Sequence, residues 1–591
     1  MNKIKEIYNL LVNSYSNYKY GIALLIFSGF FSGLLEGVGV TSLIPLFSLI
    51  TGKGELGDDV VSRVVQVFFS VLGIEYSLKF LLIFVFLLFL LKFLVEILTV
   101  YFSSLINTNY ERDIMRKLFQ RTVDASWTFL SRQKIGHLDN IFSIDVKYSR
   151  ALLLKLSDIF MLLSTTLVYV VLAVNISFFI TSLTVFFGIL LLLLYKPSVY
   201  KIKRDSNESN IFRKKVANFV GEHIMGIKVV KASGLEDTIK NKINVFFERL
   251  RKLQMGVMLR KTVSGIAIQP LGLLYIFIIF SVSYKNSDFN IASFTVIVFL
   301  IHRIFQYVKQ LQLSMNTVGE SIPYVKHIDA YLKETEINEE INIGVEPFKF
   351  EKQLEFEQVD FSYEPDKPVL DDFNIKINKG DMIGLVGSSG SGKTTVVDLL
   401  LRLYTVKKGA IVLDGRDITG IDLKKWRQNV GYVSQDLFLL NSTIAENIRF
   451  YDENRITEED MIKAVKMANI YEFVKSKSQG LDYQVGERGG NLSVGQRQRI
   501  VIARVLARNP KILVFDEATS SLDSESEQVI KDVISSLKRS ITIIIIAHRL
   551  NTVMDCDKVF VIQESKIIES GSPDKLLKNE SSYFRKLYNI N

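Results

Sequence analysis

The stretch Gly387-Ser388-Ser389-Gly390-Ser391-Gly392-Lys393-Thr394 decides the fold of the second half of this chain. It has the spacing G-x-x-x-x-G-K-[ST], in which glycines let backbone N–H groups approach phosphates, the lysine reaches the β- and γ-phosphates, and the last hydroxyl can hold Mg²⁺. Its context argues against a chance match, because the apolar segment 382–386 leads in and the helical segment 393–402, which contains Thr395, leads out. These residues predict an ATP phosphate site.

A second element that points to nucleotide chemistry is Lys-Ile-Leu-Val-Phe-Asp-Glu at 511–517. Four apolar residues predict a buried strand, at whose end the two carboxylates emerge. Asp516 can then hold Mg²⁺, and Glu517 can polarise an attacking water, since phosphoryl transfer depends mainly on positioning and electrostatic stabilisation. A solvated pair of strand-end carboxylates is the simpler alternative. The phosphate loop upstream favours the catalytic interpretation.

Composition divides the chain into a membrane half and a soluble half. Of 591 residues, 48% are hydrophobic, and they concentrate in the first half. The net charge of +10 does not point to nucleic acid, because the excess Lys and Arg lie largely in loops beside apolar runs, as at a cytoplasmic membrane face. The single cysteine, Cys556, cannot form an intrachain disulfide and fits a reducing compartment.

Six apolar runs are long enough to cross a bilayer core of about 30 Å as helices. The third and fourth meet at Asn175, which predicts a tight turn at one membrane face. The long loops after the second and fourth runs are rich in Lys and Arg, which places these loops and both termini in the cytoplasm. The predicted spans are 22–50, 80–101, 152–174, 177–194, 263–284 and 291–305.

The loops between spans predict further helix. Residues 107–150 and 196–261 keep apolar side chains at helical spacing, so helices two to five are expected to continue well beyond the bilayer. The polar run at 333–340 is typical of a linker. After it, short apolar strands alternate with amphipathic helices, which indicates an α/β domain with a largely parallel sheet. The expected domains are a transmembrane domain at 1–332, a linker at 333–352 and an ATP-binding domain at 353–591.

Between the two nucleotide elements lies Asn-Leu-Ser-Val-Gly-Gln-Arg-Gln-Arg at 491–499, which resembles the signature motif of ATP-binding-cassette (ABC) proteins, commonly L-S-G-G-Q. Ser493 and Gln496 also have the spacing of a capping box that opens an apolar helix. Both interpretations can hold together. A helix N-terminus with the Ser493 hydroxyl and the Gly495 N–H exposed suits a γ-phosphate presented by another subunit.

The resemblance extends over the rest of the cassette. It implies that Tyr363 stacks on adenine and that Gln435 belongs to the loop linking Mg²⁺ and the catalytic water to the membrane domain. It also implies that Asp523, in Ser-Leu-Asp at 521–523, belongs to the D-loop, and that His548 is the switch histidine at the γ-phosphate. Alone, Tyr363 would more often be a packing residue and His548 an ordinary strand-end histidine. Their roles depend on the joint match.

One departure from the common signature is Val494, which stands where the first glycine is usual. We expect activity to survive, because Ser493, Gly495 and Gln496 remain and valine removes no donor. Val494 is expected to affect the rate of ATP hydrolysis and the affinity with which two cassettes close. Glu517 is intact, so the chain does not resemble members that lack their own catalytic glutamate.

Six spans before one cassette resemble the half-transporters of ABC exporters, over nearly the whole sequence. This implies an all-α six-helix transmembrane domain followed by an α/β P-loop cassette, acting as a dimer with ATP between the phosphate loop of one chain and the signature of the other. A homodimer is favoured, and a heterodimer stays open. Segments 125–131 and 225–234 lie where the family has coupling helices, although ordinary amphipathic helix is the alternative. Analogy favours a bacterial inner membrane with the cassette in the cytoplasm.

Ionisable residues within or near the spans are candidates for substrate contact, because such groups are costly in a membrane. Interhelical ion pairs or interfacial side chains are the alternative explanation. In the segment 34–45, Gly37, Gly39 and Pro45 are expected to loosen the helix beside Glu36. This one segment is similar to the first span of bacterial lipid-linked oligosaccharide flippases. The candidates are Glu36, Lys92, Glu96, Lys155, His302 and Arg303.

Three functional hypotheses follow. The first is an ATP-driven exporter or flippase for a lipid, a lipid-linked glycan or an amphipathic compound, working by alternating access. The second is a peptide or multidrug exporter with the same ATPase. The third is a nucleotide-gated channel or regulatory subunit, against which the intact Glu517 and His548 count. Six membrane-length runs exclude a soluble cassette ATPase of DNA repair.

Overall fold

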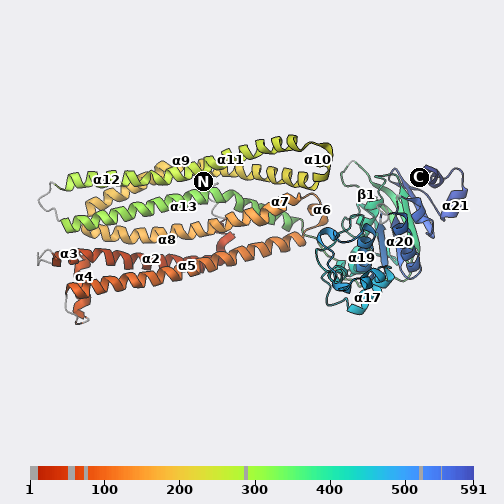
Figure 1. Cartoon of the computed structure of the whole chain (residues 1–591), viewed down its shortest axis with the longest axis horizontal. Helices are drawn as coiled ribbons and strands as arrows, with labels where there is room; N and C mark the ends of the chain where they lie inside the picture. Colours follow the sequence, from red (N-terminus) through yellow and green to blue (C-terminus); the bar gives the residue numbers. More distant parts are fainter. Residues whose placement is uncertain are drawn as a thin grey trace. The chain divides into compact units, whose positions relative to one another are not determined.

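A computed structural model describes residues 11–590 except 13, 51–59, 72, 74–76, 285–290, 366, 518–522 and 548. The chain divides into two compact units (Figure 1). The first comprises Met1–Ala125 and Phe129–Glu339, and the second comprises Ser126–Thr128 and Glu340–Asn591. The first unit is helical and the second is α/β, which confirms the predicted order of fold classes.

The helical unit is a bundle of long helices joined by short ones (Figure 1). Its long helices are α2 (Lys19–Thr41), α5 (Leu78–Val123), α8 (Val146–Ile176), α9 (Phe178–Met225), α11 (Glu236–Ile266), α12 (Ile268–Ser283) and α13 (Ile291–Ile337). Its short helices are α3 (Leu43–Ile50), α4 (Val60–Val71), α6 (Trp127–Leu130), α7 (Ile135–Asn140) and α10 (Ile227–Ser233). A 3₁₀ turn at Ser16–Tyr18 precedes α2, and a π-helical turn at Ile141–Asp145 joins α7 to α8.

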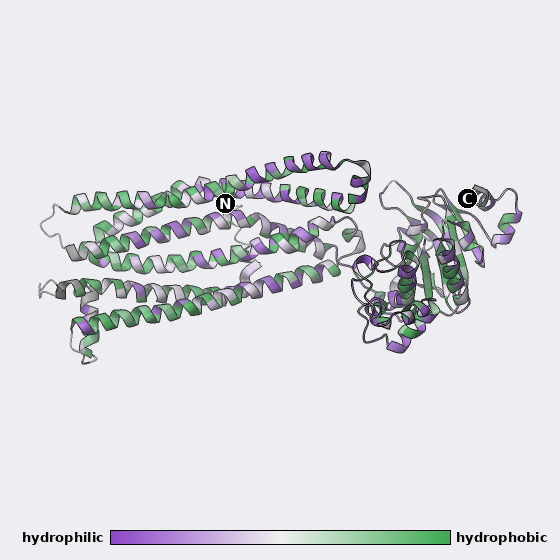
Figure 2. Ribbon diagram, viewed as in Figure 1, coloured by the Kyte–Doolittle hydropathy of each residue, from purple (hydrophilic) through white to green (hydrophobic). Residues whose placement is uncertain are grey.

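Five helical stretches of the described residues are long and apolar enough to cross a membrane. The 46 residues of α5 alone span about 69 Å, more than twice a bilayer core. The prediction that helices continue beyond the bilayer is therefore confirmed, and Figure 2 shows polar residues gathering along the bundle toward α10. The sixth predicted span forms the first part of α13 and stays a prediction as a membrane span. The five stretches are Ser16–Leu46, Leu78–Val123, Gly136–Ile176, Phe178–Met225 and Glu236–Val282.

The predicted tight turn between spans three and four is also found. Helix α8 ends at Ile176 and α9 begins at Phe178, so Ser177 alone separates them in an extended conformation. Its hydroxyl accepts a hydrogen bond from the backbone N–H of Ile180 at 3.4 Å and caps α9. The two predicted coupling segments each contain a short helix, α6 and α10, whose coupling role remains a prediction.

Helices α2 and α8 pack closely through glycines spaced one turn apart. A Cβ atom on Gly29 would lie 2.1 Å from Met161 Cγ, and one on Gly33 would lie 2.9 Å from Thr165 Cγ2. Small residues at this spacing let two helix backbones approach within a membrane. The expected loosening over 34–45 is found near Pro45 but not at the glycines: α2 continues through Gly37 and Gly39 to Thr41 and is interrupted at Ser42, three residues before Pro45.

The polar run at 333–340 is not a linker throughout. Helix α13 continues to Ile337, since polar side chains are compatible with a helix whose face is exposed. The residues that follow pack on the α/β unit, where Arg427 donates two hydrogen bonds of 2.7 Å to the Glu340 carboxylate. The division between the two units, at Glu339 and Glu340, falls within the predicted linker 333–352, of which residues 333–337 are helical.

The α/β unit contains two sheets. The larger has the order β10-β9-β3-β8-β7-β6 and is parallel except for β10, as predicted. The smaller, β2-β1-β4-β5, is antiparallel and was not predicted. The strands are β1 (Gln353–Phe361), β2 (Leu370–Asn378), β3 (Met382–Gly387), β4 (Lys408–Leu413), β5 (Arg416–Asp417), β6 (Val430–Val433), β7 (Ile512–Asp516), β8 (Thr542–Ile546), β9 (Lys558–Gln563) and β10 (Lys566–Gly571).

Central strands β7 and β8 are buried at every residue, which explains their continuous apolar sequence. Helices cover the sheet and build two apolar cores around it. They are α14 (Lys393–Leu400), α15 (Leu423–Asn429), α16 (Ile444–Arg449), α17 (Glu458–Met467), α18 (Tyr471–Ser476), α19 (Val494–Leu506), α20 (Ser524–Leu537), α21 (Pro573–Lys578) and α22 (Tyr583–Ile590).

Candidate functional site

The predicted phosphate loop connects the end of β3 to the start of α14. Two of its glycines are required by geometry. A Cβ atom on Gly387 would lie 2.2 Å from the Ile562 carbonyl oxygen, and Gly392 has φ +103° with its Cβ direction blocked by the Val369 carbonyl at 2.8 Å. The loop therefore turns tightly against the carboxyl end of the parallel sheet, the edge at which open α/β sheets bind ligands.

Lys393 is buried at the N-terminus of α14 and folds toward the loop. Its amino group donates to the carbonyls of Gly387 at 3.0 Å and Ser388 at 2.8 Å. Burial lowers the pKa of Lys393, and the nearby carboxylates of Glu517 and Asp516 oppose that shift. The amino group is thus held inside the loop and close to both acidic residues.

The loop fits a phosphate chain. The Ser391 hydroxyl is buried and has no hydrogen-bond partner within the described part of the chain, and a Cβ atom on Gly390 would meet open space. Oxygen ligands suited to Mg²⁺ are also present, because the Thr394 hydroxyl is on an exposed residue and the Asp516 carboxylate accepts a hydrogen bond from Tyr432 at 3.2 Å. Tyr432 has no motif of its own and was not among the predicted site residues.

Glu517 directly follows β7, as predicted, and contacts a second predicted residue. The Gln435 amide donates a hydrogen bond of 2.8 Å to the Glu517 carboxylate. The backbone of Glu517 has φ +49°, an uncommon conformation for a residue other than glycine, and its N–H donates to the Ile546 carbonyl at 3.1 Å. The structure thus brings together two residues that lie far apart in the sequence and that were both predicted to act at the catalytic water, Glu517 from its strand-end position and Gln435 from the family resemblance.

Tyr363 lies beside the phosphate-loop helix. Its hydroxyl is 3.1 Å from the Thr395 hydroxyl and donates to the Asp398 carboxylate at 3.3 Å. Its ring packs edge-on against Tyr404, with centroids 5.2 Å apart, and the residue is 44% exposed. An exposed ring anchored at its hydroxyl can offer a face to a base. Tyr404 and Asp398 were missed because neither has a distinctive spacing.

Asp398 gives a prediction about pH. Burial, together with the negative charge of Asp516, raises the pKa of Asp398 to about 6. Since this folded-state pKa lies above the unfolded value of about 3.9, the carboxyl favours folding below pH 4, and that contribution is lost as the pH rises through 6. We expect Asp398→Asn to raise the melting temperature relative to wild type at pH 7, with a smaller difference at pH 5. Thermal unfolding of the full chain checks this, and an equal difference at both pH values would contradict it.

The signature segment has the predicted capping box. The Ser493 hydroxyl accepts from the Gln496 N–H at 3.2 Å, and the Gln496 side chain accepts from the Ser493 N–H at 3.0 Å. Gly495 is required by packing, because a Cβ atom there would lie 2.8 Å from Ser526 Oγ. Val494 points outward with 36% exposure, so valine at this position disturbs no internal packing.

Of the two remaining residues predicted from the family pattern, the structure describes Asp523 but not His548. Asp523 is the N-cap of α20, and its carboxylate accepts from the Ser526 N–H at 3.2 Å, which helps to lower the pKa of Asp523. Ser521 and the residue after it lie outside the described residues, and so does His548. Their roles therefore stay predictions.

In the helical unit, four of the predicted charged residues form one connected cluster. Glu36 on α2 pairs with Lys92 on α5 at 3.0 Å and accepts a hydrogen bond from Arg303 on α13. Lys92 also pairs with Glu96 at 3.2 Å. The Glu36 side chain is only 4% exposed. The charges of two acidic and two basic side chains cancel. This favours interhelical ion pairs, the alternative to substrate contact, as the explanation for these residues.

His302 is joined to this cluster through a residue that was not predicted. Gln306 lies 2.8 Å from the His302 ring nitrogen and accepts a hydrogen bond of 2.8 Å from Arg303. His302, Gln306 and Gln269 line a largely apolar cavity of about 290 Å³ between α12 and α13. Lys155, in contrast, pairs with Asp158 on its own helix at 2.6 Å. An apolar cavity with a few polar groups is typical of a small-molecule site.

Comparison with known proteins gives the same two-part organisation. Residues 22–308 match the family of the ABC transporter transmembrane region, and residues 370–520 match the ABC transporter family. The Bacillus subtilis protein YgaD, named as a multidrug export ATP-binding/permease protein, is 31% identical over 546 residues, which is 90% of each chain.

Two further similarities differ in extent. An ATP-dependent lipid A-core flippase of Idiomarina loihiensis is 45% identical over 236 residues, 40% of each chain. The solved structure of a bacterial Atm1-family ABC exporter with ATP bound covers 98% of both chains with a TM-score of 0.78 at 22% identity. The second similarity shows that the whole chain has the exporter fold.

Proposed function

The chain belongs to the ABC transporter family and has the exporter fold, and from this premise we propose that two copies of it move an amphipathic, lipid-like compound across a bacterial inner membrane. The contact between Gln435 and Glu517 beside the phosphate loop carries the proposal that the chain hydrolyses ATP itself. A cassette that only binds nucleotide has no need of a glutamate held at that position.

The proposed roles at the ATP site follow from the geometry. Residues 387–392 and Lys393 bind the phosphates, and the exposed face of Tyr363 supports the adenine. Thr394 and Asp516, with Gln435, would hold Mg²⁺, which supplies positive charge against the phosphates when it is bound. Glu517 orients and polarises the attacking water, and Gln435 fixes the Glu517 carboxylate.

We propose that the second half of the ATP site comes from a second copy of the chain. The N-terminus of α19 carries Ser493, Gly495 and Gln496, and its capping box fixes the first turn. Aligned peptide dipoles at such an N-terminus favour a negative group. Because Val494 is exposed and removes no hydrogen-bond donor, it permits this contact.

The cargo is proposed from the helical unit. The cavity lined by His302, Gln306 and Gln269 is mainly apolar, which suits part of an amphipathic molecule. The relatives named as multidrug export proteins favour a second candidate, export of drug-like compounds, through the same cavity. The similarity to a lipid A-core flippase, which covers 40% of the chain, favours the first candidate, a lipid-like cargo.

The experiment that tests the proposal is an ATPase assay of the purified chain in lipid nanodiscs with lipids, lipid-linked glycans, peptides and drugs. Glu517→Gln serves as the blank. We expect one amphipathic class to stimulate turnover in the wild type only. ATP binding without any Glu517-dependent turnover would contradict a self-sufficient pump and would indicate a missing partner or a regulatory role.

A further inference from the structure

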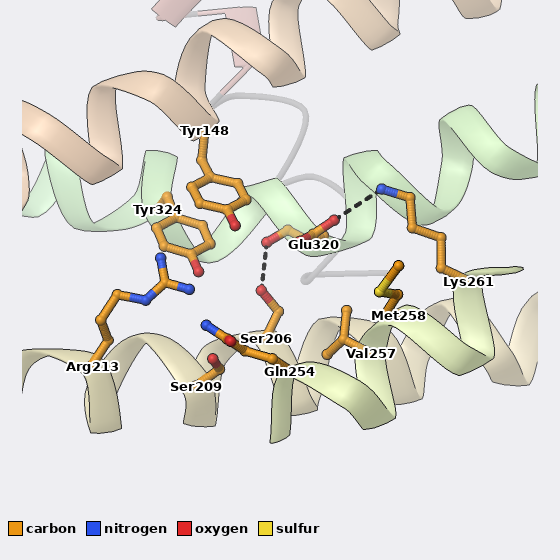
Figure 3. Close-up of a pocket in the computed structure, with 10 residues that line it drawn as sticks. All are labelled: Tyr148, Ser206, Ser209, Arg213, Gln254, Val257, Met258, Lys261, Glu320 and Tyr324. Carbon is orange, nitrogen blue, oxygen red and sulfur yellow. Dashed lines mark hydrogen bonds and ion pairs between the residues drawn. The ribbon is translucent and has the colours of Figure 1, made fainter. Parts of the chain in front are cut away.

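A second cavity of about 290 Å³ lies within the helical unit, distinct in its lining from the one at His302. Figure 3 shows its walls, which come from α8, α9, α11 and α13. Polar and charged side chains dominate the lining, with Val257 and Met258 of α11 as its apolar part. Eight of the ten lining residues carry groups that can form hydrogen bonds, so the cavity can hold a polar ligand.

The position of this cavity corresponds to the cytoplasmic membrane surface. Tyr148 precedes the predicted span 152–174 by one turn, and Lys261 precedes the span 263–284 by two residues. At 1.5 Å per residue these side chains lie within about 6 Å of the ends of those spans. In the proposed orientation, both ends face the cytoplasm. Arg213 and Tyr324 lie further from the predicted spans along α9 and α13, each 19 residues beyond the span ends at 194 and 305. The cavity therefore extends from the depth of the lipid headgroups into the cytoplasmic part of the bundle.

The charges of the lining leave one cation uncompensated. Lys261 pairs with Glu320 at 3.2 Å, and the Ser206 hydroxyl donates to the Glu320 backbone carbonyl at 2.9 Å. Arg213, in contrast, makes no hydrogen bond or ion pair with any residue that the structure describes. In Figure 3 its guanidinium points toward the hydroxyl end of Tyr324. The cavity thus has a net positive charge on a group with five N–H donors.

An aromatic wall holds this arrangement in place. The rings of Tyr148 and Tyr324 stack with centroids 4.0 Å apart and planes within 6° of parallel. Tyr324 is only 1% exposed and is therefore held rigidly by packing. Both hydroxyl ends are turned toward the cavity in Figure 3. With Ser209, they supply neutral hydroxyl groups to the lining, while the Ser206 hydroxyl proton is already donated to the Glu320 carbonyl.

We propose that this cavity binds the phosphate headgroup of a lipid on the cytoplasmic side. Arginine binds phosphate with paired, charge-assisted hydrogen bonds, and basic pockets between transmembrane helices at this surface are suited to lipid headgroups. The volume lies at the lower limit of small-molecule pockets, about 300 Å³, so it accommodates a headgroup while the chains stay in the bilayer. The inference rests on the proposed function, whose cargo it narrows to a phosphate-bearing lipid.

Direct binding tests this assignment. The full chain in phosphatidylcholine nanodiscs is titrated by calorimetry with dihexanoyl phosphatidic acid, with dihexanoyl phosphatidylcholine and with sodium phosphate. We expect phosphatidic acid to bind more tightly than either of the others. Arg213→Gln should weaken that binding at least about 10-fold, the loss expected for one charged hydrogen-bond partner. Arg213→Lys should restore part of the affinity, because it keeps the charge but not the paired donors.

Lys215→Gln is the matched control, since it removes the same charge from an exposed position on the same helix. Wild-type affinity in this variant and unchanged melting temperatures would support a specific site at Arg213. The proposal would be overturned if wild type and Arg213→Gln bound phosphatidic acid with equal affinity. It would also be overturned if Arg213→Gln weakened phosphatidylcholine binding as much as phosphatidic acid binding. If sodium phosphate bound as tightly as phosphatidic acid, the assignment of the cavity to a lipid headgroup would be overturned in favour of free phosphate. The titration uses no ATP. Its result therefore does not depend on whether the chain shows the Glu517-dependent ATP turnover of the proposed function.

Discussion

Replacement of Glu517 by glutamine is expected to lower steady-state ATPase turnover by about 10²–10⁴-fold while ATP binding is retained. Glutamine has nearly the same shape, so Gln435 can still contact the side chain, but the negative charge that polarises the water is lost. Lys393 and the glycine loop are untouched, which preserves the phosphate contacts. Turnover in nanodiscs and equilibrium binding of labelled ATP measure the two effects separately.

Glu459→Gln provides the control for that experiment. Glu459 lies in the first turn of α17 with an exposed side chain, so the same chemical change there should leave turnover at the wild-type rate. If Glu517→Gln also hydrolysed ATP at the wild-type rate, Glu517 would not be the catalytic carboxylate. Loss of ATP binding in Glu517→Gln would instead show that the substitution disturbs the phosphate loop.

Reversal of Glu36 to lysine is expected to destabilise the helical unit strongly and to abolish transport. The Glu36 carboxylate contacts two cations, Lys92 and Arg303, and is almost completely buried. Lysine would place three positive groups together with only the half-exposed Glu96 as an acidic partner. Breaking a buried ion pair costs about 3–5 kcal/mol. Thermal unfolding in nanodiscs measures the loss of stability, and cargo-stimulated ATPase measures the coupling.

Two variants separate burial from charge in that cluster. Glu96→Lys also reverses a charge in contact with Lys92, but its side chain is 53% exposed, so its effect on the melting temperature should be much smaller. Removing both partners in Glu36→Gln with Lys92→Gln should cost less than the sum of the single changes. A Glu36→Lys protein with wild-type melting temperature and transport would show that the cluster has neither a structural nor a substrate role.

The parts of the fold predicted from sequence are those with a local signal. The phosphate loop, the buried strand before Glu517 and the capping box at Ser493 each occupy one continuous segment, and each is found as expected. The antiparallel sheet was missed, although β1 and β2 show buried residues at alternate positions over parts of their length. Its strands pair between separated segments, which one continuous pattern does not reveal.

The ends of helices were less predictable than their existence. Helix α13 continues into the polar run at 333–337 because an exposed helix tolerates Lys and Glu at most positions. The same limit applies to the charged cluster. Sequence identifies Glu36, Lys92 and Arg303 as costly in a membrane, but only the packing of α2, α5 and α13 shows that they neutralise one another.

The candidate sites that sequence analysis missed consist of residues without a motif. Tyr432 and Tyr404 are ordinary aromatic residues until the fold places them beside Asp516 and Tyr363. Arg213 belongs to a basic loop whose many cations look alike in sequence, and only the closure of four helices shows which one lines a cavity. Its place in the cavity lining, and the lack of a hydrogen bond or ion pair to any residue that the structure describes, distinguish it from the other cations of the loop.

The most direct test of ATP-driven export is translocation of a lipid in proteoliposomes. Vesicles with outward-facing cassettes receive fluorescent phosphatidic acid in the outer leaflet, and ATP is added outside to wild type or to Glu517→Gln. We predict that ATP moves the lipid to the inner leaflet in the wild type and that ADP or Glu517→Gln gives only the protein-free rate. Equal translocation with ATP and ADP, or by both proteins, would contradict a pump driven by hydrolysis at Glu517.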